Sequence, residues 1–118
     1  MKYLCLIYND DKRLDAMSER ESQAFIDEHL DYDEALKRSG HFIASEALEP
    51  GEAATIVRVR NGRLSTTDGP FAETKEQLGG FYLVEARDLN EAIQIAGKIP
   101  SARTGSIEVR PVCELTHS

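Results

Sequence analysis

His29 and Asp68 are the two side chains of this sequence whose types best suit proton transfer. An imidazole titrates near neutral pH, and a carboxylate that orients it and stabilises its cation supports general acid–base catalysis. His29 lies in a helical stripe with Phe25, Tyr32 and Leu36, which predicts that its ring faces the protein interior. Two interpretations stay open: a packed, hydrogen-bonded core histidine, or a base in a low-dielectric pocket.

Asp68 lies near the start of TTDGPFAETKEQLGGF, residues 66–81, which combines turn residues, charges and a glycine pair. One interpretation is that Asp68 orients His29; the other is that it accepts backbone amides in an Asx-turn before Gly-Pro. The same segment supplies an apolar anchor, a cation and a close backbone approach. We predict ligand-binding roles for Pro70, Phe71, Lys75, Gly80 and Phe81. The alternatives are core packing and a solvated, salt-bridged turn.

The residues that a metal, nucleotide or disulfide site would need do not have the necessary spacing. The three histidines form no HxH, HxxxH or HxxE pattern, so we predict no metal site. Gly79-Gly80 lacks the strand-GxGxxG-helix context of a nucleotide site. The two cysteines form no CxxC pair, which indicates reduced thiols rather than a disulfide or a zinc site.

Length and charge limit the classes of protein. With 118 residues, the chain is expected to form one domain, residues 1–118. The net charge of -7 argues against nucleic acids and anionic membranes as partners, because phosphate binding needs a field of lysine and arginine. The apolar run at residues 3–8 is too short for a signal peptide, which predicts a cytoplasmic protein.

Capping and turn signals divide the chain into elements. Ser18 and Glu21 form a capping box that predicts the start of a helix, and Gly40 is suited to end it. Asn61-Gly62 predicts a two-residue hairpin. Its register pairs Arg60 with Arg63, Val59 with Leu64, Val57 with Thr66 and Thr55 with Asp68, which places Asp68 on the apolar face of the hairpin. The full prediction is a polar connection over 9–17, a second helix after residue 88, and strands at 3–8, 42–48, 55–60, 63–67, 80–86 and 107–112.

This order predicts an α+β fold. Two β-α-β units in a chain of this length favour a ferredoxin-like split βαβ arrangement with an inserted β-hairpin. Its antiparallel sheet would carry both helices on one face. The other face would expose apolar side chains, which predicts either a dimer or a binding cleft.

The nine residues DGPFAETKE stand intact at 68–76, followed by QLGGFY, and GSIEVRPV occupies 105–112. With the opening MKYLCLIYND and the segment SEALEP, they make the chain resemble the DGPFAETKE, or DGPF-domain, family of YCII-related proteins. The resemblance implies a bacterial, ferredoxin-like dimer without a bound cofactor. Some members of the wider superfamily are regarded as enzymes with a His-Asp pair in the cleft, and one kind eliminates chloride from a chlorinated hydroquinone. His29 matches the first-helix histidine of that superfamily.

Two functional hypotheses follow. In the first, His29 is the acid–base group and Asp68 orients it for elimination or isomerisation of a small, aromatic or anionic molecule. In the second, the protein is a non-catalytic module that senses a ligand or binds a partner. Family members are often encoded beside extracytoplasmic-function sigma factors, which implies a regulatory role for this alternative.

Overall fold

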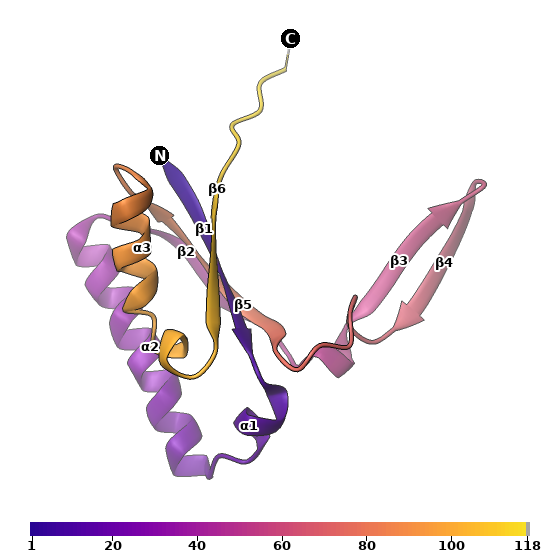
Figure 1. Ribbon diagram of the computed structural model, residues 1–118, viewed down its shortest axis with the longest axis horizontal. Helices are drawn as coiled ribbons and strands as arrows, with labels where there is room; N and C mark the ends of the chain where they lie inside the picture. Colours follow the sequence, from indigo (N-terminus) through magenta and orange to yellow (C-terminus); the bar gives the residue numbers. More distant parts are fainter. Residues whose placement is uncertain (118) are drawn as a thin grey trace.

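The computed structural model describes residues 1–117 and shows an α+β fold with antiparallel sheets, as the sequence predicts. The main sheet has four strands in the order β2-β5-β1-β6, and a separate ribbon pairs β3 with β4 (Figure 1). The strands are β1 Lys2–Asn9, β2 Phe42–Ala47, β3 Thr55–Arg60, β4 Arg63–Asp68, β5 Gln77–Glu85 and β6 Ser106–Pro111. The helices are α1 Asp11–Asp15, α2 Glu19–Ser39 and α3 Leu89–Gly97, with short 3₁₀ turns η1 Gly51–Ala53 and η2 Pro100–Arg103.

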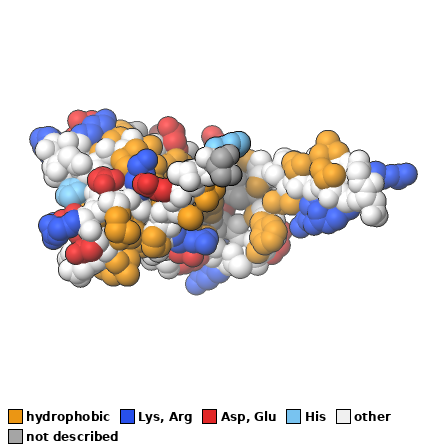
Figure 2. All heavy atoms as spheres, turned by 90° about the horizontal axis from the view of Figure 1, so that it is seen from above, with side chains coloured by type: hydrophobic (Ala, Val, Ile, Leu, Met, Phe, Trp, Pro, Cys, Tyr) orange, Lys and Arg blue, Asp and Glu red, His pale blue; other side chains and the backbone are white. Residues whose placement is uncertain are grey.

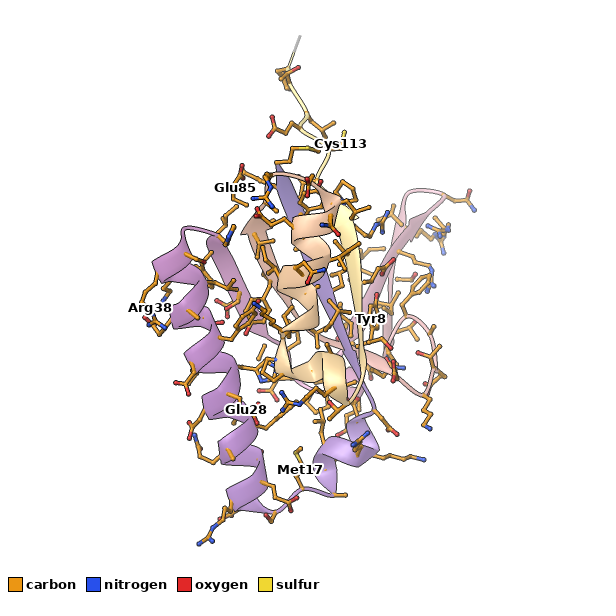
Figure 3. All side chains as sticks on the ribbon, turned by 60° about the vertical axis from the view of Figure 1, so that its left-hand side comes forward. Tyr8, Met17, Glu28, Arg38, Glu85 and Cys113 are labelled. Atoms are coloured by element: carbon orange, nitrogen blue, oxygen red, sulfur yellow. The ribbon has the colours of Figure 1, made fainter. Side chains whose placement is uncertain are left out.

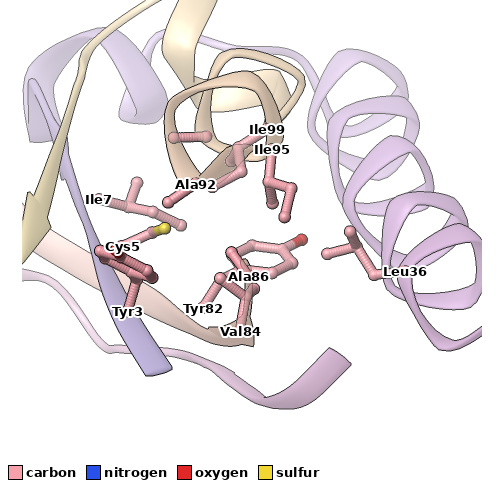
Figure 4. Close-up of a cluster of buried hydrophobic side chains, with 11 residues drawn as sticks. Tyr3, Cys5, Ile7, Leu36, Tyr82, Val84, Ala86, Ala92, Ile95 and Ile99 are labelled. Carbon is pink, nitrogen blue, oxygen red and sulfur yellow. The ribbon is translucent and has the colours of Figure 1, made fainter. Parts of the chain in front are cut away.

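The core lies between one face of the main sheet and the helices α2 and α3 (Figure 4). Alternate residues of β1 and β5 point into it, because successive side chains of a strand face opposite sides. Its buried members are Tyr3, Cys5, Ile7, Leu36, Tyr82, Val84, Ala86, Ala92, Ile95, Ala96 and Ile99. Burial raises the pKa of the Cys5 thiol to about 11, so this group is a neutral packing residue at physiological pH.

Helix α2 begins and ends where the capping signals predict. The Ser18 hydroxyl accepts from the amide of Glu21, whose carboxylate accepts from the amide of Ser18. Gly40 ends the helix with a φ of 80°. The expected polar connection over residues 9–17 is wrong in one respect: Asp11–Asp15 is helical, because Asp10 caps a short turn at the amide of Lys12.

The β3–β4 ribbon, residues 55–68, extends away from the main body and is called the arm (Figure 1). Its predicted register is confirmed: Val59 pairs with Leu64, and the turn at Asn61 and Gly62 has positive φ angles of 52° and 74°. Val57, Val59 and Leu64 are about 60 to 70% exposed. Figure 2 shows hydrophobic and cationic side chains along the arm, on the right of the view. The dimer, which we predicted to cover the helix-free face of the main sheet, stays a prediction.

The length and the polarity of the helices determine whether any of them could cross a membrane. Among the described residues, none of the helices combines the length and the apolar character that crossing a bilayer requires.

Candidate functional site

A cavity of about 430 Å³ lies between α2, α1 and the ends of β1, β2 and β5; we call it the His29 cavity. Most of its wall is apolar. Met17, in the turn between α1 and α2, is part of that wall (Figure 3). Its polar lining side chains include Asn9, His29, Asp33, Ser45, Tyr82 and Ser101.

The hydrogen bonds of His29 determine which ring nitrogen carries the proton. Nδ1 lies 2.9 Å from the carbonyl oxygen of Phe25, one turn earlier on α2. A carbonyl only accepts, so in the neutral ring Nδ1 is the donor and Nε2 is the free base. The Ser101 hydroxyl lies 3.0 Å from Nε2 and donates to it. The Phe25 ring meets the imidazole edge-on at 4.7 Å, which fixes its plane.

Ser101 links His29 on α2 to Asn9 at the end of β1. Its side chain comes from η2, between α3 and β6, and the residue is 1% exposed. The side-chain amide of Asn9, at the end of β1, donates to the Ser101 hydroxyl at 3.3 Å. One chain of hydrogen bonds therefore runs from Asn9 through Ser101 and His29 to the carbonyl of Phe25.

Asp33 follows His29 by one helical turn and lines the same cavity. Its Oδ2 accepts from the Ser45 hydroxyl at 3.1 Å. Its Oδ1 is buried and has no hydrogen-bond partner among the described residues. Nearby, the Tyr82 hydroxyl donates to the carbonyl of His29 at 3.2 Å. Burial and, secondarily, the Asp33 carboxylate raise the pKa of Tyr82, which keeps this phenol protonated.

Three residues with predicted site roles, His29, Gly80 and Phe81, line this cavity together. An added Cβ at Gly80 would lie 2.6 Å from the carbonyl oxygen of Glu46, so the close approach there is to strand β2. Phe71 is 82% exposed and does not line this cavity. It is also absent from the lining of a second cavity, which lies at the base of the arm. The core packing considered for Phe71 is therefore absent.

The structure does not bring Asp68 to His29. Asp68, Pro70 and Lys75 line the second cavity, which has a volume of about 820 Å³, at the base of the arm. The hairpin register places Asp68 on the apolar face as predicted, but the arm pairs only with itself and carries that face away from the main sheet. Within the chain, the carbonyl of Phe25 occupies the orienting position at Nδ1 of His29 that we assigned to Asp68.

Comparison with known proteins identifies the family. A model of the YCII-related domain matches residues 1–116. The chain belongs to the YCII-related family. It is 38% identical over 114 residues to an uncharacterised protein of Rhizobium meliloti (strain 1021), an alignment that covers 95% of this chain and 92% of the relative.

Asp33, Ser101 and Asn9 line the His29 cavity of this YCII-related protein, and the sequence prediction named none of them. Asp33 could have been predicted from the sequence, because it stands four residues after His29 and shares its helix face. Ser101 has no such signal, because it lies 72 residues from His29 in a segment expected to be a loop. Asn9 ends a strand and was assigned to a polar connection.

The stability of this YCII-related protein is expected to fall as the pH rises from about 9 to 12. Burial raises the pKa of Cys5 from 9.0 to about 11, and burial together with Cys5 raises that of Tyr32 from 10.0 to about 12. In this pH range the unfolded chain binds fewer protons than the folded one, so the free energy of unfolding decreases. Below pH 9 the contribution of both groups is complete.

Urea unfolding at pH 8, 10 and 11 measures this loss. The urea midpoint should decrease across the series, and a Tyr32→Phe variant should show a smaller decrease above pH 10, because it lacks one of the titrating groups. A midpoint that is unchanged between pH 8 and 11 would contradict the assignment.

Proposed function

We propose that this protein is an acid–base enzyme whose His29 cavity binds a small, mainly apolar molecule that carries a hydrogen-bond donor. The observation that supports this most directly is Asp33 Oδ1, a buried carboxylate oxygen without a partner among the described residues. A buried, unpaired carboxylate oxygen is costly, and a hydroxyl or ammonium group of a ligand would satisfy it. The cavity volume of about 430 Å³ suits such a molecule.

His29 supplies the proton acceptor in this proposal. With Nδ1–H held by the carbonyl of Phe25, only Nε2 can take a proton from the cavity side, either directly or through the Ser101 hydroxyl. The resulting imidazolium would share the cavity with the Asp33 carboxylate. Elimination requires such a group to remove a proton from carbon as the leaving group departs, and isomerisation requires it also to return the proton to another carbon.

Lys75 does not contribute to this cavity, so its assignment to an anionic ligand belongs to the second cavity. Among the described residues, those lining the His29 cavity include no lysine or arginine, whereas Asp33 and Glu46 are carboxylates. The proposed ligand is therefore neutral or cationic.

Ligand binding without turnover is the second candidate. Both ring nitrogens of His29 are hydrogen-bonded within the chain, and Ser101 is almost fully buried, as in a structural network. In this case the cavity would serve for sensing, and a sigma-factor link would rest on the family resemblance alone.

Binding of phenol and anisole, followed by amide NMR shifts, tests the proposal. The two molecules have similar size, but only phenol donates a hydrogen bond. Phenol should bind about tenfold more tightly, the equivalent of one net hydrogen bond of about 1.4 kcal/mol to a charged group. Asp33→Leu should remove this preference, and Asp31→Asn, an exposed change on the same helix, should preserve it. Equal affinities in the unaltered protein would refute the proposed role of Asp33.

Deuterium exchange separates an enzyme from a binding module. An acid–base enzyme should catalyse exchange of the α-protons of 4-hydroxycyclohexanone, whose hydroxyl supplies the donor, in D₂O, and His29→Gln should abolish the catalysed part, because glutamine cannot accept the proton. Binding of phenol without any His29-dependent exchange would favour the sensing candidate.

We also place the protein in the DGPFAETKE branch of its family and expect the ferredoxin-like arrangement and homodimer of that branch. The intact motif at residues 68–76 supports the first assignment. The strand order β2-β5-β1-β6 supports the second. The exposed apolar side chains of the arm support the third.

A further inference from the structure

We propose that Ser101 is a nucleophile, activated by His29, for acyl transfer from small apolar esters. The inference goes beyond the proposed function, but it rests on the same His29 base and assigns a second group, the Ser101 hydroxyl, on which that base acts. It is carried by the arrangement of Ser101, His29 and Asn9 at the wall of one cavity.

The nucleophile and the base are in place in the absence of a ligand. Ser101 Oγ lies 3.0 Å from Nε2 of His29, within the range for direct proton transfer. The carbonyl of Phe25 holds Nδ1–H at 2.9 Å, so Nε2 is the unprotonated nitrogen. This is the three-part logic of an activated serine, with a backbone carbonyl as the group that orients the ring.

Asn9 provides the third requirement, a donor for the oxyanion. Its Nδ2 lies 3.3 Å from Ser101 Oγ, and a primary amide has two N–H groups, one of which remains for a substrate oxygen. Asn9 is 7% exposed and is held at the end of β1, where it pairs with Gln77 of β5. A rigid amide donor next to the nucleophile stabilises a tetrahedral intermediate effectively, because it needs no reorganisation.

The wall of the cavity defines the substrate class. Ile7, Phe25, Leu30 and Phe81 line it and favour an apolar acyl or aryl group. The lack of lysine and arginine among its described lining residues disfavours an anionic ester. A short-chain neutral ester that carries a hydroxyl group fits both features, and its hydroxyl could donate to Asp33 Oδ1.

The reaction balances with water as the second reactant. Ser101 Oγ forms a bond to the acyl carbon while its proton moves to Nε2 of His29. The bond from the acyl carbon to the alcohol oxygen then breaks, and His29 returns the proton to the leaving alcohol. Water next attacks the acyl-serine, His29 takes one proton from it, and the proton passes to Ser101 Oγ as the carboxylic acid leaves.

Diisopropyl fluorophosphate tests the nucleophile on the full chain. Attack by Ser101 Oγ forms a P–O bond and releases fluoride, so intact-mass spectrometry should show one adduct, and peptide mapping should place it on Ser101. Ser101→Ala should abolish labelling, and His29→Gln should slow it about 100-fold, a typical contribution of a general base. Ser106→Ala, a change at an exposed serine outside the cavity, should label at the rate of the unaltered protein.

Peptide mapping of the adduct in the unaltered protein tests whether Ser101 is the nucleophile, even if a variant fails to fold. No adduct, or an adduct on a residue other than Ser101, overturns the inference. If phenol binding with its Asp33 preference persists in that case, the proposed binding function survives and only the nucleophile is rejected. If the adduct forms on Ser101 but phenol and anisole bind equally, the nucleophile stands and the role of Asp33 is rejected.

Discussion

Alanine at position 105 is expected to lower the free energy of unfolding by about 3 kcal/mol, the upper part of the usual range for overpacking. A Cβ at Gly105 would overlap the backbone carbonyl oxygen of Tyr8 and lie 2.8 Å from Oδ1 of Asn9. The overlapping atom belongs to the backbone of a central strand, so no side-chain rotation relieves it. Strand β1 would have to move away from β6, and Asn9 would move with it.

Gly97→Ala is the matched control for this change. Gly97 lies in α3, and an added Cβ there would meet no atom within 4 Å. Since alanine favours a helix over glycine by up to about 1 kcal/mol, this variant should be as stable as the unaltered protein or slightly more so. Urea unfolding of the three proteins gives the comparison. If Gly105→Ala and Gly97→Ala are equally stable, the close contact between position 105 and strand β1 does not limit the free energy of unfolding.

Ile99→Ala should also cost about 3 kcal/mol, because it removes a fully buried side chain and leaves a cavity. Ile99 is 0% exposed and immediately precedes η2, the turn that carries Ser101. Truncation there should loosen η2 and lengthen the contact between Ser101 and His29. The serine-labelling rate should therefore decrease together with the urea midpoint.

Ile93→Ala provides the comparison for Ile99. Ile93 is the same residue type, but it lies on α3 and is 49% exposed. Its truncation should cost less than about 1 kcal/mol, in line with partial exposure. If the two substitutions destabilise the protein equally, Ile99 does not anchor η2 as we describe.

The features that the sequence predicts well are those fixed by neighbours in the chain. The arm register follows from two turn residues, Asn61 and Gly62, and every predicted pair from Thr55–Asp68 to Arg60–Arg63 is present. The boundaries of α2 follow from one capping box and one glycine. Local hydrogen bonds and backbone preferences determine these features, so a single sequence contains the necessary information.

The site depends on contacts between distant segments, which the sequence predicts only in part. The apolar stripe of α2 places His29 toward the interior, and its half-burial agrees with that prediction. Its partner Ser101 is brought by η2 packing against α2 and β1, an arrangement without a local signal. Asp68 lines a different cavity from His29, because β3 and β4 pair only with each other and carry Asp68 away from the main sheet.

The open strand edges of the arm affect how copies of the protein could associate. A two-stranded ribbon with two open edges is a template for continued strand addition, which leads to aggregation. Arg60 faces Arg63 across the tip, and Arg58 lies close by on the same strand. Two arms that joined edge to edge near their tips would bring six guanidinium groups together, and this repulsion opposes open-ended growth. The arginines therefore oppose edge-to-edge growth from the tip of the arm.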